Sequence, residues 1–259
     1  MSVVSVSNKS DVVISVRGLV KSYGKGQGKQ TVIDSLDMDI YAGDFTVIMG
    51  SSGAGKSTLL YCLAGMDRVD SGEVVFAEEN IVGMSEDSLA VFRRQHCGFV
   101  FQNVHLVQSM SLMDNALAAA LLVETDKKAA VSRAKTLFEQ VNISPSTWEK
   151  LPSQVSGGQA ARAGIVRSVI NKPSVVFADE PTGALNSENS EAVLDVLDDL
   201  SREGQTIVMV THDRNSAIRG NRIIYLHDGN IRGTCELSPD MPREQRLAHL
   251  DEFLEEMGW

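Results

Sequence analysis

The stretch GSSGAGKST, residues 50–58, constrains the fold more than any other part of this 259-residue sequence. It matches the pattern G-x-x-x-x-G-K-[ST], in which glycines let backbone N–H groups curl around phosphate oxygens. DFTVIM precedes it and STLLYCLAG follows it, which predicts a strand, a phosphate-binding loop and a helix. In such a loop Lys56 reaches the β- and γ-phosphates of a nucleotide, and Ser57 ligates magnesium. The alternative, a glycine turn in an unrelated α/β protein, would not require this context.

An acidic pair ends a second apolar segment, SVVFADE at 174–180. If this segment is a buried strand of a parallel sheet, Asp179 emerges at the carboxyl edge, where the phosphate loop of an open α/β sheet also lies. There Asp179 can hold the magnesium, directly or through water, and Glu180 can polarise an attacking water as general base. The alternative is a solvated acidic pair, and for such a pair without a phosphate loop it is the better interpretation.

A second anion site is predicted at VSGGQAAR, residues 155–162, because AARAGIVRSVI continues from it with no helix breaker. A small polar residue and glycines at a helix start leave N–H groups free to meet an anion, and the helix dipole adds positive potential. The chain already has a phosphate loop about a hundred residues earlier, so the sequence raises the question why it carries two such sites.

The remaining pattern favours an α/β fold. TIVMVT (206–211), like SVVFADE, is typical of a strand buried on both faces of a parallel sheet. Further strands are expected at 11–20, 36–41, 73–76 and 98–101, residues 103–170 have a mostly helical pattern, and Asp228-Gly229 signals a hairpin. We expect one domain over residues 1–237, with a helical subdomain at about 103–165.

The tail, residues 238–259, differs in composition from the rest of the chain. Its apolar residues fall on one helical face: Leu247, Leu250, Phe253, Leu254 and Met257. This pattern predicts an amphipathic C-terminal helix docked on its own domain, and a partner-binding helix is the alternative.

Composition narrows the function classes. A net charge of −10 gives no basic surface for nucleic acid, so no nucleic-acid partner is expected. Three widely spaced cysteines, without a CxxC pair, indicate neither a disulfide framework nor a zinc site and fit a reducing cytosol. The N-terminal stretch MSVVSVSNKS lacks a basic start and a long apolar stretch, so it is not expected to be a secretory signal, and the longest apolar run, ALAAALLV at 116–123, is too short to span a membrane. Any membrane-spanning part is therefore expected on another chain.

Six motifs in order resemble those of the ATP-binding cassette (ABC) ATPases, over about residues 12–235. They are Tyr23 before the phosphate loop, GSSGAGKST, Gln102 in FVFQN, VSGGQ, VVFADEP and His212 in VTHD. The resemblance implies a P-loop ATPase with a RecA-like parallel-sheet core, an N-terminal antiparallel β subdomain and an inserted helical subdomain. It also answers the question of two anion sites: in that family two cassettes meet head to tail, and ATP lies between the phosphate loop of one and the serine-glycine motif of the other.

The resemblance implies a role for each motif residue, with ATP and Mg²⁺ as ligands. Tyr23 would stack on adenine, although a ring that only packs is the alternative. Gln102 would touch the magnesium site, and His212 would contact the γ-phosphate and orient Glu180. The expected catalytic residues are Glu180, His212 and Lys56, and the expected metal-site residues are Ser57, Gln102 and Asp179. The expected nucleotide-binding residues are Tyr23, Gly50, Ser51, Ser52, Gly53, Ala54, Gly55, Lys56, Ser57, Thr58, Gln102, Ser156, Gly157, Gly158 and Gln159.

Two departures from the family pattern stand out. Ala160 and Ala161 replace the glutamines common after SGGQ, beyond the phosphate-contacting part. Asn186 stands where many members carry aspartate, which keeps an acceptor but loses the charge and makes crosstalk between subunits through that loop less certain.

Three uses of ATP compete: membrane transport, a soluble role in DNA or translation, and a membrane complex for cell division or signalling. The soluble classes usually carry coiled-coil or zinc inserts or a second cassette, which this sequence lacks. Details such as LAGMDRVDSGEV and FADEPTGALN resemble the ATPases of large-extracellular-domain permeases, of the macrolide-exporter, lipoprotein-release and bacitracin-resistance type. The resemblance implies export, release or resistance involving peptides or lipids.

The implied partners are an integral membrane permease with an FtsX-like large extracellular domain and a second copy of the chain. The implied location is the cytoplasmic face of the cell membrane. The expected permease contact is VHLVQSMSLMDNAL, in which several large apolar residues are expected to be exposed: Val104, Leu106, Val107, Met110, Leu112 and Met113. The alternative is ordinary packing in the helical subdomain, which accounts for some of these residues, and the rest would form a groove for a short permease helix.

Overall fold

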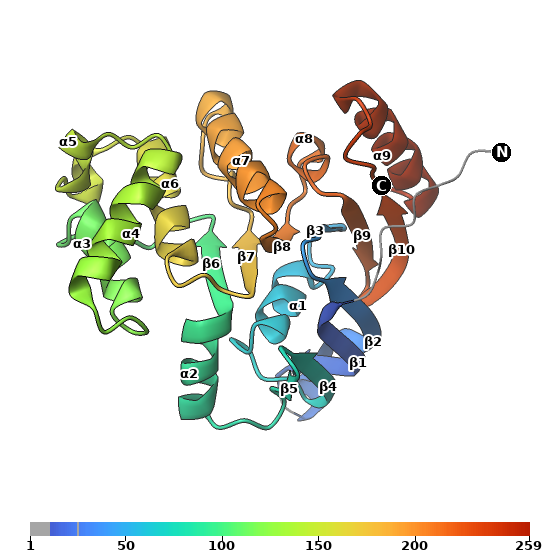
Figure 1. Ribbon diagram of the computed structural model, residues 1–259. Helices are drawn as coiled ribbons and strands as arrows, with labels where there is room; N and C mark the ends of the chain where they lie inside the picture. The colour runs from blue at the N-terminus through green and yellow to red at the C-terminus, as the bar shows by residue number, and fades with distance from the viewer. Residues whose placement is uncertain (1–10, 25) are drawn as a thin grey trace.

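The computed structural model describes residues 11–24 and 26–259. Its centre is a six-stranded sheet in the order β10-β9-β3-β8-β7-β6, drawn in Figure 1. The strands are β3 (Phe45–Met49), β6 (Cys97–Phe101), β7 (Val175–Asp179), β8 (Thr206–Val210), β9 (Arg222–His227) and β10 (Asn230–Glu236). All neighbours pair in parallel except β10, which is antiparallel to β9.

The apolar runs of the sequence become strands buried on both faces of this sheet. In β8, Ile207 and Met209 enter one hydrophobic core, whereas Val208 and Val210 enter the other. Because successive side chains of a strand point to opposite faces, a strand covered on both sides is apolar at nearly every position. The same alternation runs through β3 and β7, so the predicted parallel core is confirmed.

The second sheet is antiparallel, with the order β2-β1-β4-β5. Its strands are β1 (Val12–Tyr23), β2 (Gln30–Tyr41), β4 (Ser71–Phe76) and β5 (Glu79–Asn80), and a short 3-10 turn, η1 (Gly26–Gly28), joins β1 to β2. Helix α1 (Lys56–Leu63) shares a core with this sheet, because its Leu59 and Leu63 are buried with Ile14 and Ile33. Helix α2 (Glu86–His96) follows β5 and leads into β6.

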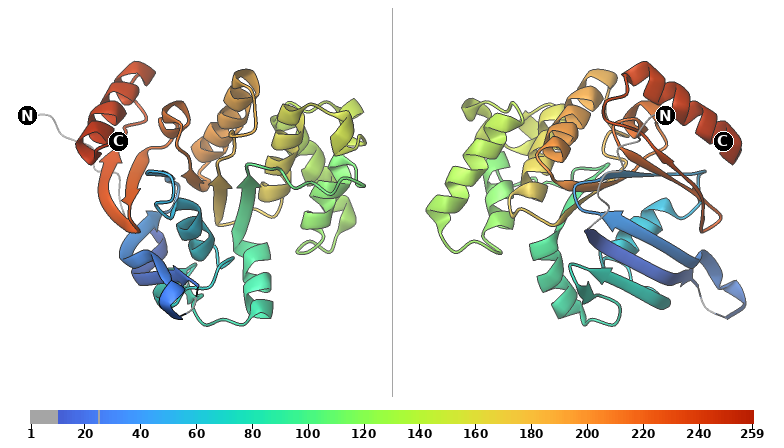
Figure 2. Two further views of the ribbon diagram at one scale, coloured as in Figure 1. Left: turned by 180° about the vertical axis from the view of Figure 1, so that it is seen from behind. Right: turned by 45° about the vertical axis from the view of Figure 1, so that its right-hand side comes forward.

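Helices gather beyond β6, at one end of the central sheet, in all views of Figures 1 and 2. They are α3 (Leu112–Ala120), α4 (Lys127–Gln140), α5 (Pro145–Trp148) and α6 (Gly157–Val169), with the short 3-10 turn η2 (Pro152–Gln154) before α6. Their buried residues belong to the same core as one face of the sheet.

The large apolar side chains of the segment 104–113 divide between the two expected outcomes, packing in the helical subdomain and exposure. Leu106, Leu112 and Met113 are buried, at 6%, 1% and 6% exposed, while Val107 and Met110 remain exposed at 47% and 38%.

The cause is the buried amide of Asn115, which folds the preceding loop back onto α3. Its Nδ2 donates to the carbonyls of Val107, Met110 and Ser111, and its Oδ1 accepts from the Val107 N–H. A loop closed in this way turns some of its apolar side chains into the core, which removes them from any docking surface.

Helices α7, α8 and α9 of the C-terminal part lie along the sheet from β7 to β10, the end opposite β6 (Figure 1). Helix α7 (Ser187–Arg202) follows β7, α8 (Arg214–Ala217) follows β8, and α9 (Arg243–Met257) packs beside β10 with Leu250 and Leu254 buried in the core. The predicted hairpin joins β9 to β10, with Asp228 and Gly229 at φ 46° and 75°. Among the described residues, no helix is both long enough and apolar enough to cross a membrane.

Candidate functional site

The phosphate loop connects β3 to α1 and is held open by glycines. Gly53 and Gly55 have φ of 80° and 95°, and Gly50 lies so close to β9 that a Cβ would be 2.1 Å from the Leu226 carbonyl oxygen. The N-cap of α1, Gly55, supplies no side-chain bond, so the first N–H groups of the helix are left for an anion. The sequence-predicted cradle of residues 50–58 therefore has the backbone geometry of a phosphate site.

Lys56 lies at the mouth of this loop. Its Nζ donates to the carbonyl oxygens of Gly50 and Ser51 at 2.8 and 2.9 Å. Burial lowers the pKa of Lys56, and the nearby carboxylates of Glu180 and Asp179 only partly oppose that effect. Its ammonium is thus a desolvated cation within the loop, and a phosphate would compensate its charge.

The end of β7 meets α1 through Asp179. Ser57 Oγ donates to Asp179 Oδ1 at 2.8 Å, and the Tyr61 hydroxyl donates to Asp179 Oδ2 at 2.6 Å. Burial raises the pKa of Tyr61, and the bond to Asp179 raises it further, so this hydroxyl keeps its proton and remains a donor.

A magnesium ion fits this corner. A hydroxyl and a carboxylate are the hard oxygen ligands that Mg²⁺ prefers, and the ion usually takes only one or two carboxylates together with substrate phosphates and water. Among the described residues, no three or more His, Cys, Asp or Glu side chains form a group that could hold a metal ion.

Tyr61 is a site residue that the sequence analysis missed. It stands four positions after Ser57, and residues four apart share one face of a helix. That spacing is the signal in the sequence, but it could be used only with knowledge that Asp179 reaches this face of α1.

Glu180 and His212 come from adjacent strands and meet at the edge of the sheet. His212 Nδ1 lies 2.9 Å from Glu180 Oε1, with the imidazole 70% exposed and the carboxylate 19% exposed. Glu180 has φ 47° and its N–H donates to the Val210 carbonyl at 3.0 Å. The two predicted catalytic side chains are therefore in contact and open to a water molecule.

Gln102 and Tyr23 each approach a different element of the site. Gln102 follows β6 and packs against the turn after Glu180, where a Cβ on Gly183 would be 2.7 Å from its Nε2. Tyr23 ends β1 with 45% exposure, and its hydroxyl donates to Asp67. Burial raises the pKa of this hydroxyl, and Thr58 of α1 is close enough to it to oppose part of that effect. The exposed ring is thus next to the start of α1.

Ser156 begins α6 as its N-cap. Its Oγ accepts from the Gln159 N–H at 3.2 Å, and Gln159 Oε1 accepts from the Ser156 N–H at 3.0 Å, which is a reciprocal capping box. Gly158 is required by packing, because a Cβ there would lie 1.9 Å from Asn189 Oδ1 of α7. In both figures α6 belongs to the helices beyond β6, whereas α1 lies against the middle of the sheet.

The site geometry agrees with a comparison against protein families. The model of the family described as ABC transporter matches residues 33–183. The chain belongs to the ABC transporter family. It is the ATP-binding cassette of that family and an ATPase.

Curated relatives place the cassette among transporter subunits. It is 40% identical over 219 residues to "Uncharacterized ABC transporter ATP-binding protein MJ1508" of Methanocaldococcus jannaschii, covering 85% of this chain and 97% of that one. It is 39% identical to the pyoverdine export ATP-binding/permease protein PvdT of Pseudomonas syringae pv. tomato, covering 92% of this chain and 36% of that one. The macrolide export ATP-binding/permease protein MacB of Escherichia coli is 36% identical, with 91% and 37% covered. The cassette spans about a third of the length of these export proteins.

Solved structures of cassettes share its fold. The dimeric structure of the bacterial ABC transporter cassette MJ0796 is 33% identical, has a TM-score of 0.79 and covers 87% of this chain and 99% of that one. A dimeric post-hydrolysis state of MJ0796 bound to ADP and Pi is 31% identical, with a TM-score of 0.80. The expected fold class is confirmed.

Proposed function

We propose that this cassette hydrolyses MgATP at composite sites formed by two cassettes and thereby drives a membrane permease. One observation carries the proposal: the phosphate loop lies between β3 and α1, whereas the serine-glycine motif starts α6 among the helices beyond β6 (Figure 1). A nucleotide on the loop beside Lys56 would be left with one side uncovered, and the N-terminus of α6, which begins at Ser156, offers the complementary anion site of a second copy.

The residues divide the chemistry between them. Lys56 binds the β- and γ-phosphates, and Ser57 with Asp179 would hold the Mg²⁺, which neutralises phosphate charge. Glu180 orients and deprotonates the attacking water, and His212 holds the Glu180 carboxylate while remaining exposed toward the γ-phosphate. Tyr23 stacks on adenine, and Gln102 senses the magnesium corner beside Gly183.

Two identical copies suffice for this arrangement. Each chain carries a phosphate loop and a serine-glycine motif, so two-fold symmetry produces two complete sites. The dimeric structures of the MJ0796 cassette, at 31–33% identity, support a homodimer. Hydrolysis then cleaves the γ-phosphate from the ATP that joins the two faces, which leaves ADP and phosphate and weakens the contact between the cassettes.

The work done by the cycle is export or release of peptide or lipid-like substrates. The export names of PvdT and MacB support this assignment, as do the sequence features of the large-extracellular-domain subgroup. The described residues lack a membrane-spanning helix, so a permease chain with a large extracellular domain would hold the cassette at the cytoplasmic face of the cell membrane.

The test compares two adjacent substitutions. Glu180→Gln keeps shape and hydrogen bonding but accepts no proton, so it should bind MgATP, lose about 10²–10⁴ in turnover and accumulate as an ATP-bound dimer. Asp179→Asn should instead lower the affinity for ATP in the presence of magnesium. Light scattering measures the dimer, and Ser156→Arg in the Glu180→Gln background should abolish it while leaving monomer binding intact.

Parental turnover in Glu180→Gln would overturn the role of that residue. A Glu180→Gln protein that stays monomeric with MgATP, both alone and beside a co-purified permease, would overturn the composite site. The membrane assignment is checked separately, by identifying the membrane chain that co-purifies with the cassette.

A further inference from the structure

Helix α8 is the element that directly follows the catalytic histidine. It spans only Arg214–Ala217, and Asp213, next to His212, is its N-cap. The Asp213 carboxylate accepts from both the N–H and the hydroxyl of Ser216, each at 2.7 Å. A single helical turn is not stable by itself, so the position of α8, and of the histidine before it, depends on what surrounds it.

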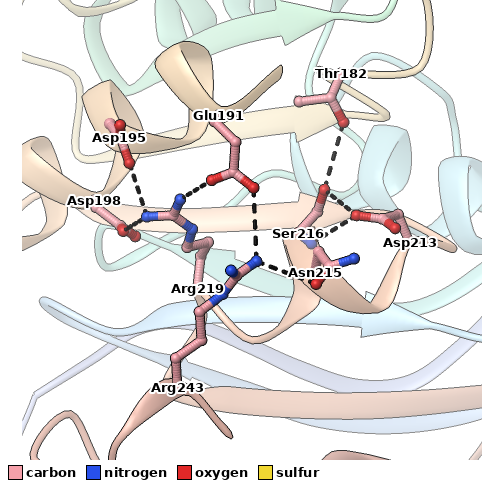
Figure 3. Close-up of polar contacts among 9 residues, drawn as sticks. All are labelled: Thr182, Glu191, Asp195, Asp198, Asp213, Asn215, Ser216, Arg219 and Arg243. Atoms are coloured by element: carbon pink, nitrogen blue, oxygen red, sulfur yellow. Dashed lines mark hydrogen bonds and ion pairs between the residues drawn. The ribbon is translucent and has the colours of Figure 1, made fainter. Parts of the chain in front are cut away.

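The inner side of α8 reaches the segment that carries Glu180. Ser216, 1% exposed, has its hydroxyl 3.5 Å from that of Thr182, two residues after Glu180 (Figure 3). This distance is long for a hydrogen bond. It nevertheless shows that the turn after β7 lies against the buried hydroxyl of Ser216 in α8.

The outer side of α8 is bound by α9 at three points. Arg214 pairs with Asp251 at 2.9 Å, Asn215 accepts from Arg243 at 3.1 Å, and the carbonyl of Gly220, just after α8, accepts from Arg246 at 2.6 Å.

The acidic face of α7 closes the third side. Arg219 contacts Glu191, Asp195 and Asp198, and Glu191 also lies 3.6 Å from Arg243 (Figure 3). One carboxylate thereby joins the arginine that follows α8 to the first residue of α9. The segment between His212 and β9 is therefore joined to α9 and to α7 by charged contacts.

We propose that α9 is a positioning element for catalysis: it braces α8 and so keeps His212 in hydrogen-bond reach of Glu180. Arg243 and Asp251 are the positioning residues on α9, and they touch neither nucleotide nor reacting atoms. The inference rests on the proposed function, because it requires His212 and Glu180 to act together in hydrolysis. It assigns to the C-terminal extension a task that its amphipathic pattern does not indicate.

The experiment removes the brace and follows ATP turnover. The double variant Arg243→Ala/Asp251→Ala should lower kcat about tenfold, which corresponds to about 1.4 kcal/mol, and leave KM for ATP near the parental value. Exposed ion pairs contribute little to folding, so its melting temperature should stay close to the parental value. The matched control is Glu256→Ala, an exposed acidic residue of α9, which should keep parental turnover.

Two further measurements separate positioning from general destabilisation. Exchanging the charges, in Arg214→Asp/Asp251→Arg, should restore most of the turnover that Asp251→Arg alone loses. In a His212→Ala background the brace variant should cause no further loss, since it acts only through that side chain.

Parental kcat in the brace variant, beside a strongly impaired His212→Ala, would overturn this inference alone. An equal tenfold loss in the His212→Ala background would overturn it too, because the effect would then bypass the histidine. Parental turnover in His212→Ala itself would instead overturn the proposed role of that residue, and the inference with it.

Discussion

The Tyr61→Phe substitution tests most directly how Asp179 is oriented at the proposed magnesium site, because it removes one hydroxyl without changing the packing of the ring. The Tyr61→Phe substitution leaves Asp179 Oδ2 without its 2.6 Å donor, while Ser57 still donates to Oδ1. The carboxylate is then free to rotate away from the direction in which it would meet magnesium.

The magnitude follows from the geometry of the bond. A hydrogen bond to a charged group contributes about 1.5–3 kcal/mol to folding. For a chain of this size each kcal/mol shifts Tm by roughly 2–4 °C. Loss of a group that orients a metal ligand typically costs about 10–100-fold in metal affinity. We therefore expect a lower Tm and a magnesium midpoint for ATP binding raised about 10–100-fold.

The assay titrates Mg²⁺ at fixed concentration of a fluorescent ATP analogue and records binding. Tyr225→Phe is the matched control, since Tyr225 is a buried tyrosine of β9 that packs against Trp259 away from this corner. Nucleotide binding without magnesium should be alike in all three proteins. If Tyr61→Phe and the parent have the same magnesium midpoint, the hydroxyl does not orient Asp179 and the reasoning fails.

Three more predictions concern the loop and its surroundings. Lys56→Ala should abolish tight nucleotide binding, measured by the same fluorescence. Gly50→Ala should lower Tm and ATP affinity more than Gly53→Ala, because a Cβ on Gly50 meets a β9 carbonyl oxygen at 2.1 Å and one on Gly53 meets nothing within 4 Å. Burial would raise the pKa of Asp67, but the hydrogen bonds from Lys21 and Tyr23 hold it below its usual value. The stabilisation is therefore present above the pKa of the unfolded state and is lost as pH falls through the folded pKa, so Asp67→Asn should flatten the acid side of a Tm-against-pH curve.

The sequence predicts the parallel core well because a strand buried on both faces has a continuous apolar run, which can be recognised locally. Every residue of a strand such as β7 must be apolar up to its last position, and Asp179 marks where the strand meets solvent. The hairpin at Asp228-Gly229 is similarly local, since its two positive φ angles restrict the residue types. The phosphate loop can also be predicted without the tertiary structure, from the spacing of the glycines and the lysine in its motif.

Tertiary contacts decide the features that the sequence does not predict. Burial within 104–113 depends on Asn115, whose amide bonds have no periodic signature. Asn186, a departure from the family pattern, has a local function as N-cap of α7, where its side chain accepts from the Asn189 N–H.

Backbone strain explains how two adjacent acids turn to different partners. Asp179 is the last residue of β7 and faces α1, where Ser57 and Tyr61 bond to it. Glu180 takes φ 47°, a conformation that costs a non-glycine residue of order 1–3 kcal/mol and persists only where the surroundings fix it. Here its N–H is bound to Val210 and its carbonyl accepts from Gly183, so the turn is fixed at both ends. The chain thereby directs the second carboxylate to His212 instead of continuing the strand. The strain thus keeps the proposed base apart from the proposed metal ligand that precedes it, so that one carboxylate would hold a metal while the other stays free to accept a proton.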